Sequence, residues 1–268
     1  MVRILTALIF AFSTLLTPSL LPHPILEATH SLYLTNTPAG GQNFFELKHA
    51  VQDGGVNIQV IDADVQIYDG SLALDSLGQP HFAWIKFNGG NFSVKYKNPQ
   101  ATETLNFNLP ERLALALDVY DVPHLTVMAN SAIYFTKRTA GIWTSPVQLF
   151  TLQAGEEFGD DLKVAIDSDG NFHIAFFTVG TMGNPCFIKH IAVTASGAVT
   201  QNIDSSLLDP CYSNIDLSLD QSSNPYLISA LQNNLALHSM GGASYPIPAA
   251  GSRPALNLGN SFPSVAYF

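Results

Sequence analysis

The chain has 268 residues, of which 47% are hydrophobic and 12% charged, with 19 Gly and 16 Pro. This composition is typical of a folded, turn-rich globular protein and excludes one that is mainly disordered. The formal net charge is −10, and no basic run interleaves with aromatic residues, so the sequence predicts no nucleic-acid partner. Composition alone indicates no activity.

The N-terminus has the pattern of a secretory signal peptide, which we place at residues 1–28. Arg3 is followed by an uncharged apolar stretch from Ile4 to Leu16. That stretch is shorter than the roughly 20 residues that a membrane-spanning helix needs. We therefore expect a secreted protein, extracellular or periplasmic, with no membrane span in its mature form. An uncleaved anchor is the alternative.

The chain has two cysteines, Cys186 and Cys211, and both lie beyond the signal peptide. An oxidising compartment favours their pairing, so we predict a disulfide between them. Two buried thiols are the alternative, and no cysteine spacing favours a metal site.

Five segments repeat one pattern of strand, tight turn and strand. Each first strand ends at a marker residue, and the five markers are Asp75, Asp118, Asp167, Asp220 and Asn257. They are 43, 49, 53 and 37 residues apart, which is the size of one four-stranded propeller blade. A small residue stands two positions before each marker and a large one directly before it, which is the period of two that a strand requires.

These repeats predict an all-β fold, a single five-bladed β-propeller over residues 29–268. The segment from Leu32 to Gly40 is similar to that from Ile133 to Gly141, an outer strand of the second blade. We therefore expect residues 32–61 to supply the outer strands of the blade that begins at Pro254. This arrangement closes the ring without leaving a sheet edge at the seam. Residues 52–68 are expected to add a hairpin.

The first repeat contains Asp75-Ser-Leu-Gly-Gln-Pro-His81 followed by alternating apolar residues. This Asp-x-x-Gly-x-Pro-His pattern resembles the propeller repeats of secreted bacterial proteins of the sialidase-like type. The resemblance covers the mature chain and implies a propeller, while related propellers include lectins, glycosidases and interaction scaffolds. No Ser-x-Asp-x-Gly-x-Thr-Trp motif occurs, so the resemblance does not imply a sialidase.

Histidines stand at equivalent positions after three turns: His81, His124 and His173. We expect each of them to lie near its marker aspartate across the hairpin and to fasten the turn. A shared metal or catalytic site is the alternative, but it would require histidines of different blades to converge.

Four carboxylates form an acidic cluster between two repeats: Glu156, Glu157, Asp160 and Asp161. We expect this cluster to lie in a connection between blades. Such a cluster can hold calcium or attract a cationic partner, or it can be a solvated acidic rim. Calcium is the one cofactor that the sequence indicates.

Polar connections and aromatic residues are the candidates for ligand contact, because loops on a rigid scaffold often bind and flat rings suit sugar faces. The candidate residues are Asn88, Asn91, Asn184, Asn233, Trp84 and Trp143. No motif of a serine hydrolase, zinc protease or phosphate-binding loop is present. The leading hypothesis is an exported, non-catalytic propeller that binds a carbohydrate or an extracellular partner. The alternatives are a glycoside hydrolase or lyase with carboxylates from the connections, and a structural subunit of an extracellular assembly.

Overall fold

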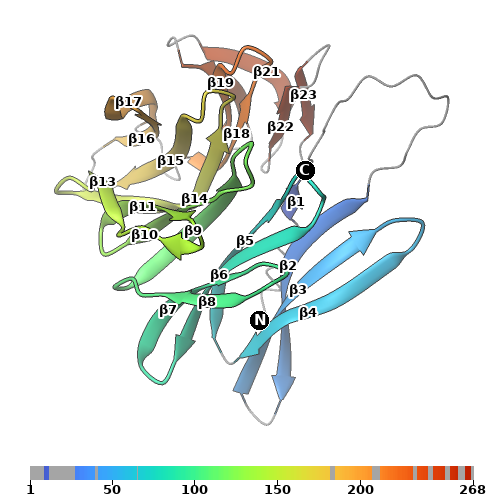
Figure 1. The fold of residues 1–268 in the computed structure, drawn as a ribbon. Coiled ribbons are helices and arrows are strands. Elements are labelled where there is room, and N and C mark those ends of the chain that lie inside the picture. The colour runs from blue at the N-terminus through green and yellow to red at the C-terminus, as the bar shows by residue number, and fades with distance from the viewer. Residues whose placement is uncertain are drawn as a thin grey trace. The chain divides into compact units, whose positions relative to one another are not determined.

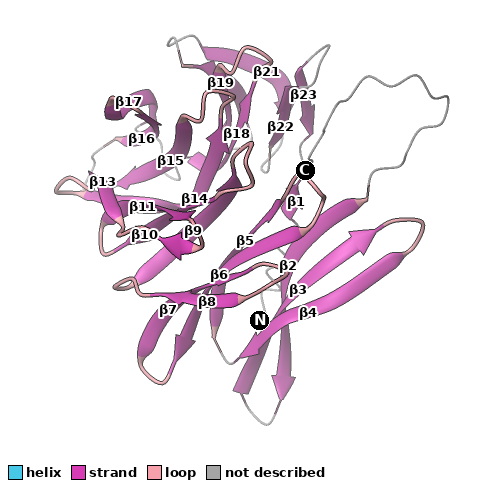
Figure 2. Ribbon diagram, viewed as in Figure 1, coloured by secondary structure: helices cyan, strands magenta, loops and turns pink. Residues whose placement is uncertain are grey.

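The computed structural model describes residues 9–11, 28–39, 42–64, 66–181, 185–206, 212–231, 234–240, 244–250, 254–258 and 263–266. All regular elements in these ranges are β-strands (Figure 2), so the expectation of an all-β protein is confirmed for them. None of the described residues belongs to a helix that is long and apolar enough to cross a membrane. The chain divides into two compact units, residues 1–111 and 112–268.

The first unit contains two antiparallel sheets of four strands each (Figure 1). Sheet 1 has the order β1-β2-β3-β4, with β1 (Ile9–Ala11), β2 (Thr29–Ala39), β3 (Gln42–Gln52) and β4 (Val56–Asp64). Sheet 2 has the order β5-β6-β7-β8, with β5 (Ile67–Leu74), β6 (Pro80–Asn88), β7 (Asn91–Lys97) and β8 (Thr102–Leu105). The hairpin predicted within residues 52–68 is confirmed, because β3 and β4 pair around the turn at residues 53–55.

The second unit contains four further sheets. Sheet 3 comprises β9 (Pro110–Leu117), β10 (Pro123–Ala129), β11 (Ala132–Thr139), β12 (Ile142–Trp143) and β13 (Val147–Thr151). Sheet 4 comprises β14 (Glu156–Ile166), β15 (Phe172–Gly180), β16 (Cys186–Thr194) and β17 (Gly197–Ser206). Sheet 5 comprises β18 (Tyr212–Leu219), β19 (Pro225–Leu231), β20 (Asn234–Ser239) and β21 (Ser244–Ala250), and sheet 6 comprises β22 (Ala255–Leu258) and β23 (Pro263–Ala266).

The five strand–turn–strand segments predicted from the repeat all form antiparallel pairs. They are β5 with β6, β9 with β10, β14 with β15, β18 with β19, and β22 with β23. Closure of the ring by residues 32–61 stays a prediction, because in the described residues β2 pairs with β1 and β3, and β23 pairs with β22. Of the expected signal peptide, Ile9–Ala11 form β1, while residues 1–8 and 12–27 lie outside the described residues.

Four marker turns share one geometry, which explains why the repeat is visible in the sequence. The marker amide donates to the carbonyl four residues later, and the amide three residues later donates back to the marker carbonyl. One carboxylate oxygen of the marker also accepts two amides, two and four residues further on, at 2.7 to 3.0 Å. The fourth turn residue has a positive φ, which glycine adopts most easily. That residue is Gly78, Asp121, Gly170 or Ser223.

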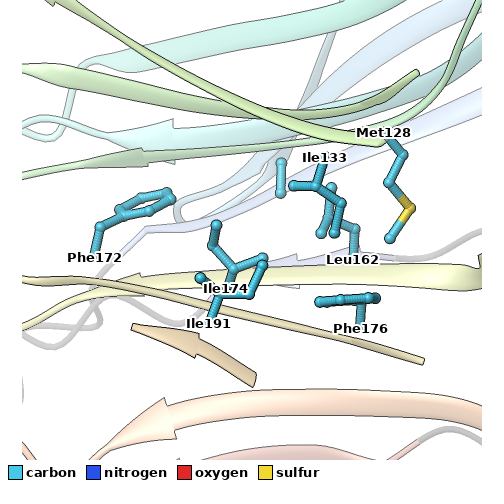
Figure 3. Close-up of a cluster of buried hydrophobic side chains, with 8 residues drawn as sticks. Met128, Ile133, Leu162, Phe172, Ile174, Phe176 and Ile191 are labelled. Atoms are coloured by element: carbon cyan, nitrogen blue, oxygen red, sulfur yellow. The ribbon is translucent and has the colours of Figure 1, made fainter. Parts of the chain in front are cut away.

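The apolar core of each unit lies between the faces of successive sheets, as expected for stacked blades. In the first unit, Leu32 and Leu47 of sheet 1 pack with Leu72, Phe82 and Trp84 of sheet 2. In the second unit, sheets 3 and 4 enclose the cluster drawn in Figure 3, whose labelled members are Met128, Ile133, Leu162, Phe172, Ile174, Phe176 and Ile191. Sheets 4 and 5 enclose another cluster, which includes Phe177, Ile188, Ile215 and Leu227.

Candidate functional site

Sheets 2, 4 and 5 each have two ends that carry different kinds of residue. One end holds the marker turn between the first and second strands, and we call it the marker rim. The other end, the opposite rim, holds the start of the first strand and the turn or connection between the second and third strands. Sheet 3 has the same two ends at β9 and β10. Because every strand runs from one rim to the other, a residue's place along its strand assigns it to a rim.

The marker rim holds three aspartate–histidine pairs. The distance from histidine Nε2 to aspartate Oδ2 is 3.2 Å for His124 and Asp118, 3.4 Å for His173 and Asp167, and 3.8 Å for His81 and Asp75. Two of these rings also meet a polar side chain on the third strand, since His81 Nδ1 lies 2.6 Å from the Tyr96 hydroxyl and His173 Nδ1 lies 3.1 Å from His190 Nε2. In the fourth turn, Asn224 Nδ2 donates to the Asp220 carboxylate instead.

Burial and hydrogen bonding fix the charges at this rim. Burial lowers the pKa of His124 and lowers the pKa of His190 to about 4, the latter with a contribution from the neighbouring His173. Burial on its own would raise the pKa of Asp118, but the amides of Val122 and Tyr120 and the His124 ring outweigh it and lower that pKa. The Asp118 carboxylate is therefore charged, and His124 and His190 are neutral, at pH 7. This charge state suits a hydrogen-bonded turn better than proton transfer.

The opposite rim of sheet 2 carries an exposed aromatic and amide surface. Asn88 and Asn91 are exposed and stand opposite each other across the turn from β6 to β7. The next residues, Phe87 and Phe92, have ring centroids 4.8 Å apart, and the Tyr68 ring of β5 lies 5.5 Å from Phe92. Tyr68 is 47% exposed. We call these five residues the aromatic–amide surface, and two of them, Asn88 and Asn91, were predicted from the sequence.

Trp84, another predicted contact residue, lies in the core. It is 2% exposed, and its indole Nε1 donates to Asp62 Oδ2 at 2.9 Å. The Lys86 ammonium donates to both oxygens of Asp62 at 3.1 Å and lies 2.9 Å from Asp64 Oδ2. Burial opposes the charge on Lys86, but these two carboxylates outweigh it and raise the lysine pKa. Trp84 has no exposed ring face, so we leave it out of the proposed contact set.

The other predicted contact residues do not join this surface. Trp143 is half-buried in β12, where it pairs with Arg138 in the second unit. Asn184 and Asn233 lie outside the described residues.

The acidic cluster lies in a strand, so its expected place in a connection was wrong. Residues 156–161 begin β14, where a register shift between Phe158 and Leu162 breaks the alternation that would have indicated a strand. Glu156 is nearly buried and meets Lys189 Nζ at 3.0 Å and Thr178 Oγ1 at 3.3 Å. Glu157 is exposed, and Asp160 is paired with Arg112.

Glu156 and Asp160 of this cluster are thus held by separate partners. Among the described residues, no group of three or more His, Cys, Asp or Glu side chains is arranged to hold a metal ion. The geometry therefore gives no support to a calcium site at Glu156, Glu157, Asp160 and Asp161.

Two carboxylates join the first strands of neighbouring sheets, which sequence analysis did not anticipate. Asp161 Oδ2 of β14 accepts a hydrogen bond from the Ile215 amide of β18 at 2.9 Å. Asp216 Oδ2 of β18 accepts one from the amide of Leu256, the second residue of β22, at 2.8 Å. Burial raises the pKa of Asp216, and the nearby Asp161 carboxylate adds to this effect. Asp161 lies six residues before its marker and Asp216 four before its own, so the repeat gives no common position that would reveal them.

The predicted disulfide is only partly within the described residues. Cys186 is buried at the start of β16, and Cys211 lies outside the described residues. The pairing of these two cysteines stays a prediction.

No family model and no curated protein matches this chain. Among solved structures, it is similar to TolB from Acinetobacter baumannii, with a TM-score of 0.52 and 12% identity over 82% of this chain and 52% of that one. It is also similar to a protein of unknown function from Dyadobacter fermentans, with a TM-score of 0.56 and 9% identity over 84% and 80% of the two chains. The polysaccharide lyase Uly1 gives a TM-score of 0.53 and 9% identity over 97% and 73%.

These likenesses, together with the antiparallel sheets, show an all-β, propeller-like fold. The chain spans about half the length of the TolB chain. At 9 to 12% identity, the likenesses concern the fold alone.

Proposed function

We propose that the protein is an exported, non-catalytic propeller that binds a carbohydrate through the aromatic–amide surface of sheet 2. The observation that carries this proposal is the Tyr68 ring, 47% exposed and supported by Phe92, at the same rim as the exposed Asn88 and Asn91. A flat apolar ring stacks on the C–H face of a sugar, while amides donate to and accept from its hydroxyls. An extracellular protein partner with an exposed glycan or amide-rich loop would use the same chemistry.

The charged groups of the opposite rims support a binding role over a catalytic one. Lys86, Lys189 and Arg112 are each paired with carboxylates. Asp161 and Asp216 each accept a backbone amide of the next sheet. A nucleophile with an adjacent base, or an acid–base pair open to substrate, is the arrangement that hydrolysis would need. The five charged groups just named are instead occupied in ion pairs and in bonds between sheets.

The proposal includes the finer architecture expected from the sequence. Residues 1–28 are removed as a signal peptide, residues 29–268 form one domain of five blades, and residues 32–61 complete the blade that begins at Pro254. The five marker hairpins support the blade number. A Cys186–Cys211 disulfide would join and stabilise the third and fourth repeats after export.

A glycan array tests the proposed function, run with calcium and with a chelator on protein expressed from the full-length sequence. We expect saturable binding to a related set of sugars, reduced about fivefold or more in Tyr68→Ala and in Asn88→Ala, because stacking and hydrogen bonding each contribute about 1 kcal/mol or more. Tyr120→Ala is the matched control, since Tyr120 is 84% exposed at a marker turn. It should bind as the unaltered protein does.

Absence of binding with calcium and with chelator would contradict the proposal, and so would equal losses in Tyr68→Ala and Tyr120→Ala. Binding that disappears with the chelator would give a cation a role in recognition.

Asp216 supports a second candidate, a glycoside hydrolase or lyase. A buried carboxyl with a raised pKa, close to Asp161 and Lys163, is the kind of group that serves as a general acid. Incubation with a polysaccharide panel, followed by assay for new reducing ends or unsaturated sugars, tests this candidate. Product formation that is lost in Asp216→Asn, with the fold retained, would replace the binding proposal.

A further inference from the structure

The outer edge strand of sheet 1 presents an unusual apolar row to solvent. β4 has β3 as its sheet neighbour among the described residues, and Figure 1 shows it as the last strand of that sheet. Val56, Ile58 and Val60 are 68%, 53% and 47% exposed, and alternation places all three on one face. Asn57 and Gln59, also exposed, lie on the other face. Residues 54–61, which include the first six residues of β4, contain neither a charged residue nor a proline.

Three other outer strands, β8, β17 and β21, carry features that normally prevent edge pairing. β8 has four residues, one of them Glu103, and β21 contains Pro246 and Pro248. Short strands, charges and prolines all hinder the addition of a further strand. β17 contains Asp204 and exposes a single large apolar residue, Val199, at 62%. β4 lacks each of these protections along its first six residues, so its edge is open to a partner strand.

The sequence of β4 is complementary to that of a second, antiparallel β4 strand. In an antiparallel pair of two β4 strands centred on Ile58, residue 56 faces residue 60 of the other copy and residue 57 faces residue 59. Val56 then meets Val60, Asn57 meets Gln59 and Ile58 meets Ile58. Apolar residues face apolar ones and amides face amides, which are favourable cross-strand pairs. We propose that β4 pairs antiparallel with β4 of a second copy of this chain, around a two-fold axis through Ile58.

The charges of the strand select this orientation. Asp62 and Asp64 lie at its end, beyond residues 56–60 that face each other in the antiparallel pair, because the partner chain turns at residues 53–55 into β3. A parallel pair in register would instead set each aspartate beside its own counterpart, and directly opposed like charges are unfavourable. A two-fold interface is also closed, so it produces a dimer and not a growing fibre.

The interface consists of one strand and one row of side chains, so we expect a reversible dimer of modest affinity. We expect the dimer to bury less surface than the roughly 1,200 Å² typical of stable complexes. The dimer is independent of the proposed carbohydrate site, because Tyr68, Asn88 and Asn91 belong to sheet 2. It would double the number of such sites on one particle and so raise avidity for a repeated ligand.

Sedimentation equilibrium over a range of concentrations tests the dimer, on protein expressed from the full-length sequence. We expect a concentration-dependent monomer–dimer equilibrium that Ile58→Lys shifts at least about tenfold towards monomer, because it opposes two ammonium groups on the axis. Val199→Lys places the same charge on an equally exposed edge residue of β17 and should leave the equilibrium unchanged. A protein that is monomeric at all concentrations, or equal shifts in both variants, would overturn the proposal.

Oxidative cross-linking tests the register independently of any loss of folding. Ile58→Cys should form a covalent dimer, since the axis sets each residue 58 opposite its counterpart. Val56→Cys and Val60→Cys should cross-link when mixed and not when each is oxidised alone. Self-linking of Val56→Cys at the same rate as the mixture would indicate a parallel or non-specific association and would contradict the proposed axis.

Discussion

The marker rim and the opposite rim differ in how closely the chain repeats itself. At the marker rim, four turns use the same backbone hydrogen bonds, and three of them add the same aspartate–histidine pair. At the opposite rim, sheet 2 has an exposed tyrosine beside two asparagines, sheet 3 has Arg112 near the start of β9, and sheet 4 has the Glu156–Lys189 pair. No two of these opposite rims are alike.

This contrast indicates where structure and function reside. A feature needed to form every blade recurs in every blade, whereas a feature that recognises one ligand is needed once. The marker rim is therefore expected to determine stability and the opposite rim to determine binding. Gly159 is an exception to this division, because it lies towards the opposite rim and its substitution is nevertheless expected to destabilise the fold.

Gly159→Ala is expected to destabilise the protein most, by about 3 kcal/mol or more, because overpacking a close-packed site forces the backbone to move. Gly159 lies near the start of β14, and a Cβ there would overlap the ring of Phe177, which is 3% exposed. Urea unfolding measures the loss. Gly55→Ala is the control, because nothing lies within 4 Å of its added Cβ. Equal stability of the two variants would show that the ring moves aside freely.

Asp167→Ala is expected to cost about 2 kcal/mol, the largest effect of a polar substitution at the marker rim. The carboxylate accepts the amides of Asp169 and Asn171 and lies 3.4 Å from His173 Nε2, so its removal leaves several donors without an acceptor. Asp160→Ala, at the opposite rim, removes an 87% exposed carboxylate and should cost less than about 0.5 kcal/mol. A similar loss in both variants would remove the distinction between the rims.

The marker rim was predictable from the sequence because its interactions are local. Aspartate begins all four turns, glycine stands three residues later in two of them, and proline stands five residues later in three. Each of the three histidines lies six residues after its marker. The five hairpins and the all-β class follow from that spacing and from the strand alternation.

The opposite rim was less predictable because its contacts join separate strands. Tyr68 lies within a register shift of β5, between Ile67 and Asp69, so the alternation does not reveal that it meets Phe92. Trp84, a predicted ligand contact, is instead buried and bonded to Asp62, and a bond between residues 22 positions apart has no sequence signature. The sequence is also ambiguous about the place of β2 in its sheet, because β2 resembles β11, the outer strand that contains Ile133. His30 of β2, however, lies 2.9 Å from His49 of β3. In sheet 4 the same contact joins the second and third strands, through His173 and His190.

Mild acid is expected to destabilise the folded protein through its buried histidines. The pKa is lowered to about 4 for both His49 and His190, first by burial and then by the neighbouring histidine. Between pH 4 and pH 6.5 the unfolded chain therefore binds more protons than the folded one, so stability is complete above pH 6.5 and is lost as pH falls.

These two residues can change the free energy of unfolding by at most about 2.7 kcal/mol per pH unit. After allowing for partial solvent access, we expect a loss of about 2 kcal/mol by pH 5.5. Urea unfolding at pH 7.0 and 5.5 measures it. His190→Gln should remove up to half of the difference in unfolding free energy between pH 7.0 and pH 5.5, whatever its effect on stability at pH 7. An unchanged difference in that variant would show that His190 titrates normally.

Gly170→Ala is expected to give the smallest effect, a loss of about 1 kcal/mol, and it isolates the backbone contribution of the marker turn. Gly170 has a φ of +79°, and nothing lies within 4 Å of an added Cβ, so left-handed strain is the only new cost. Gly170→Asn should cost less, because asparagine tolerates this conformation better. Asp121 and Ser223 occupy the same position at φ values of +59° and +63°, so the fold accepts polar side chains there. If alanine and asparagine cost the same in urea unfolding, the position is not selected for its backbone conformation, and the shared geometry of the turns rests on the marker aspartate alone.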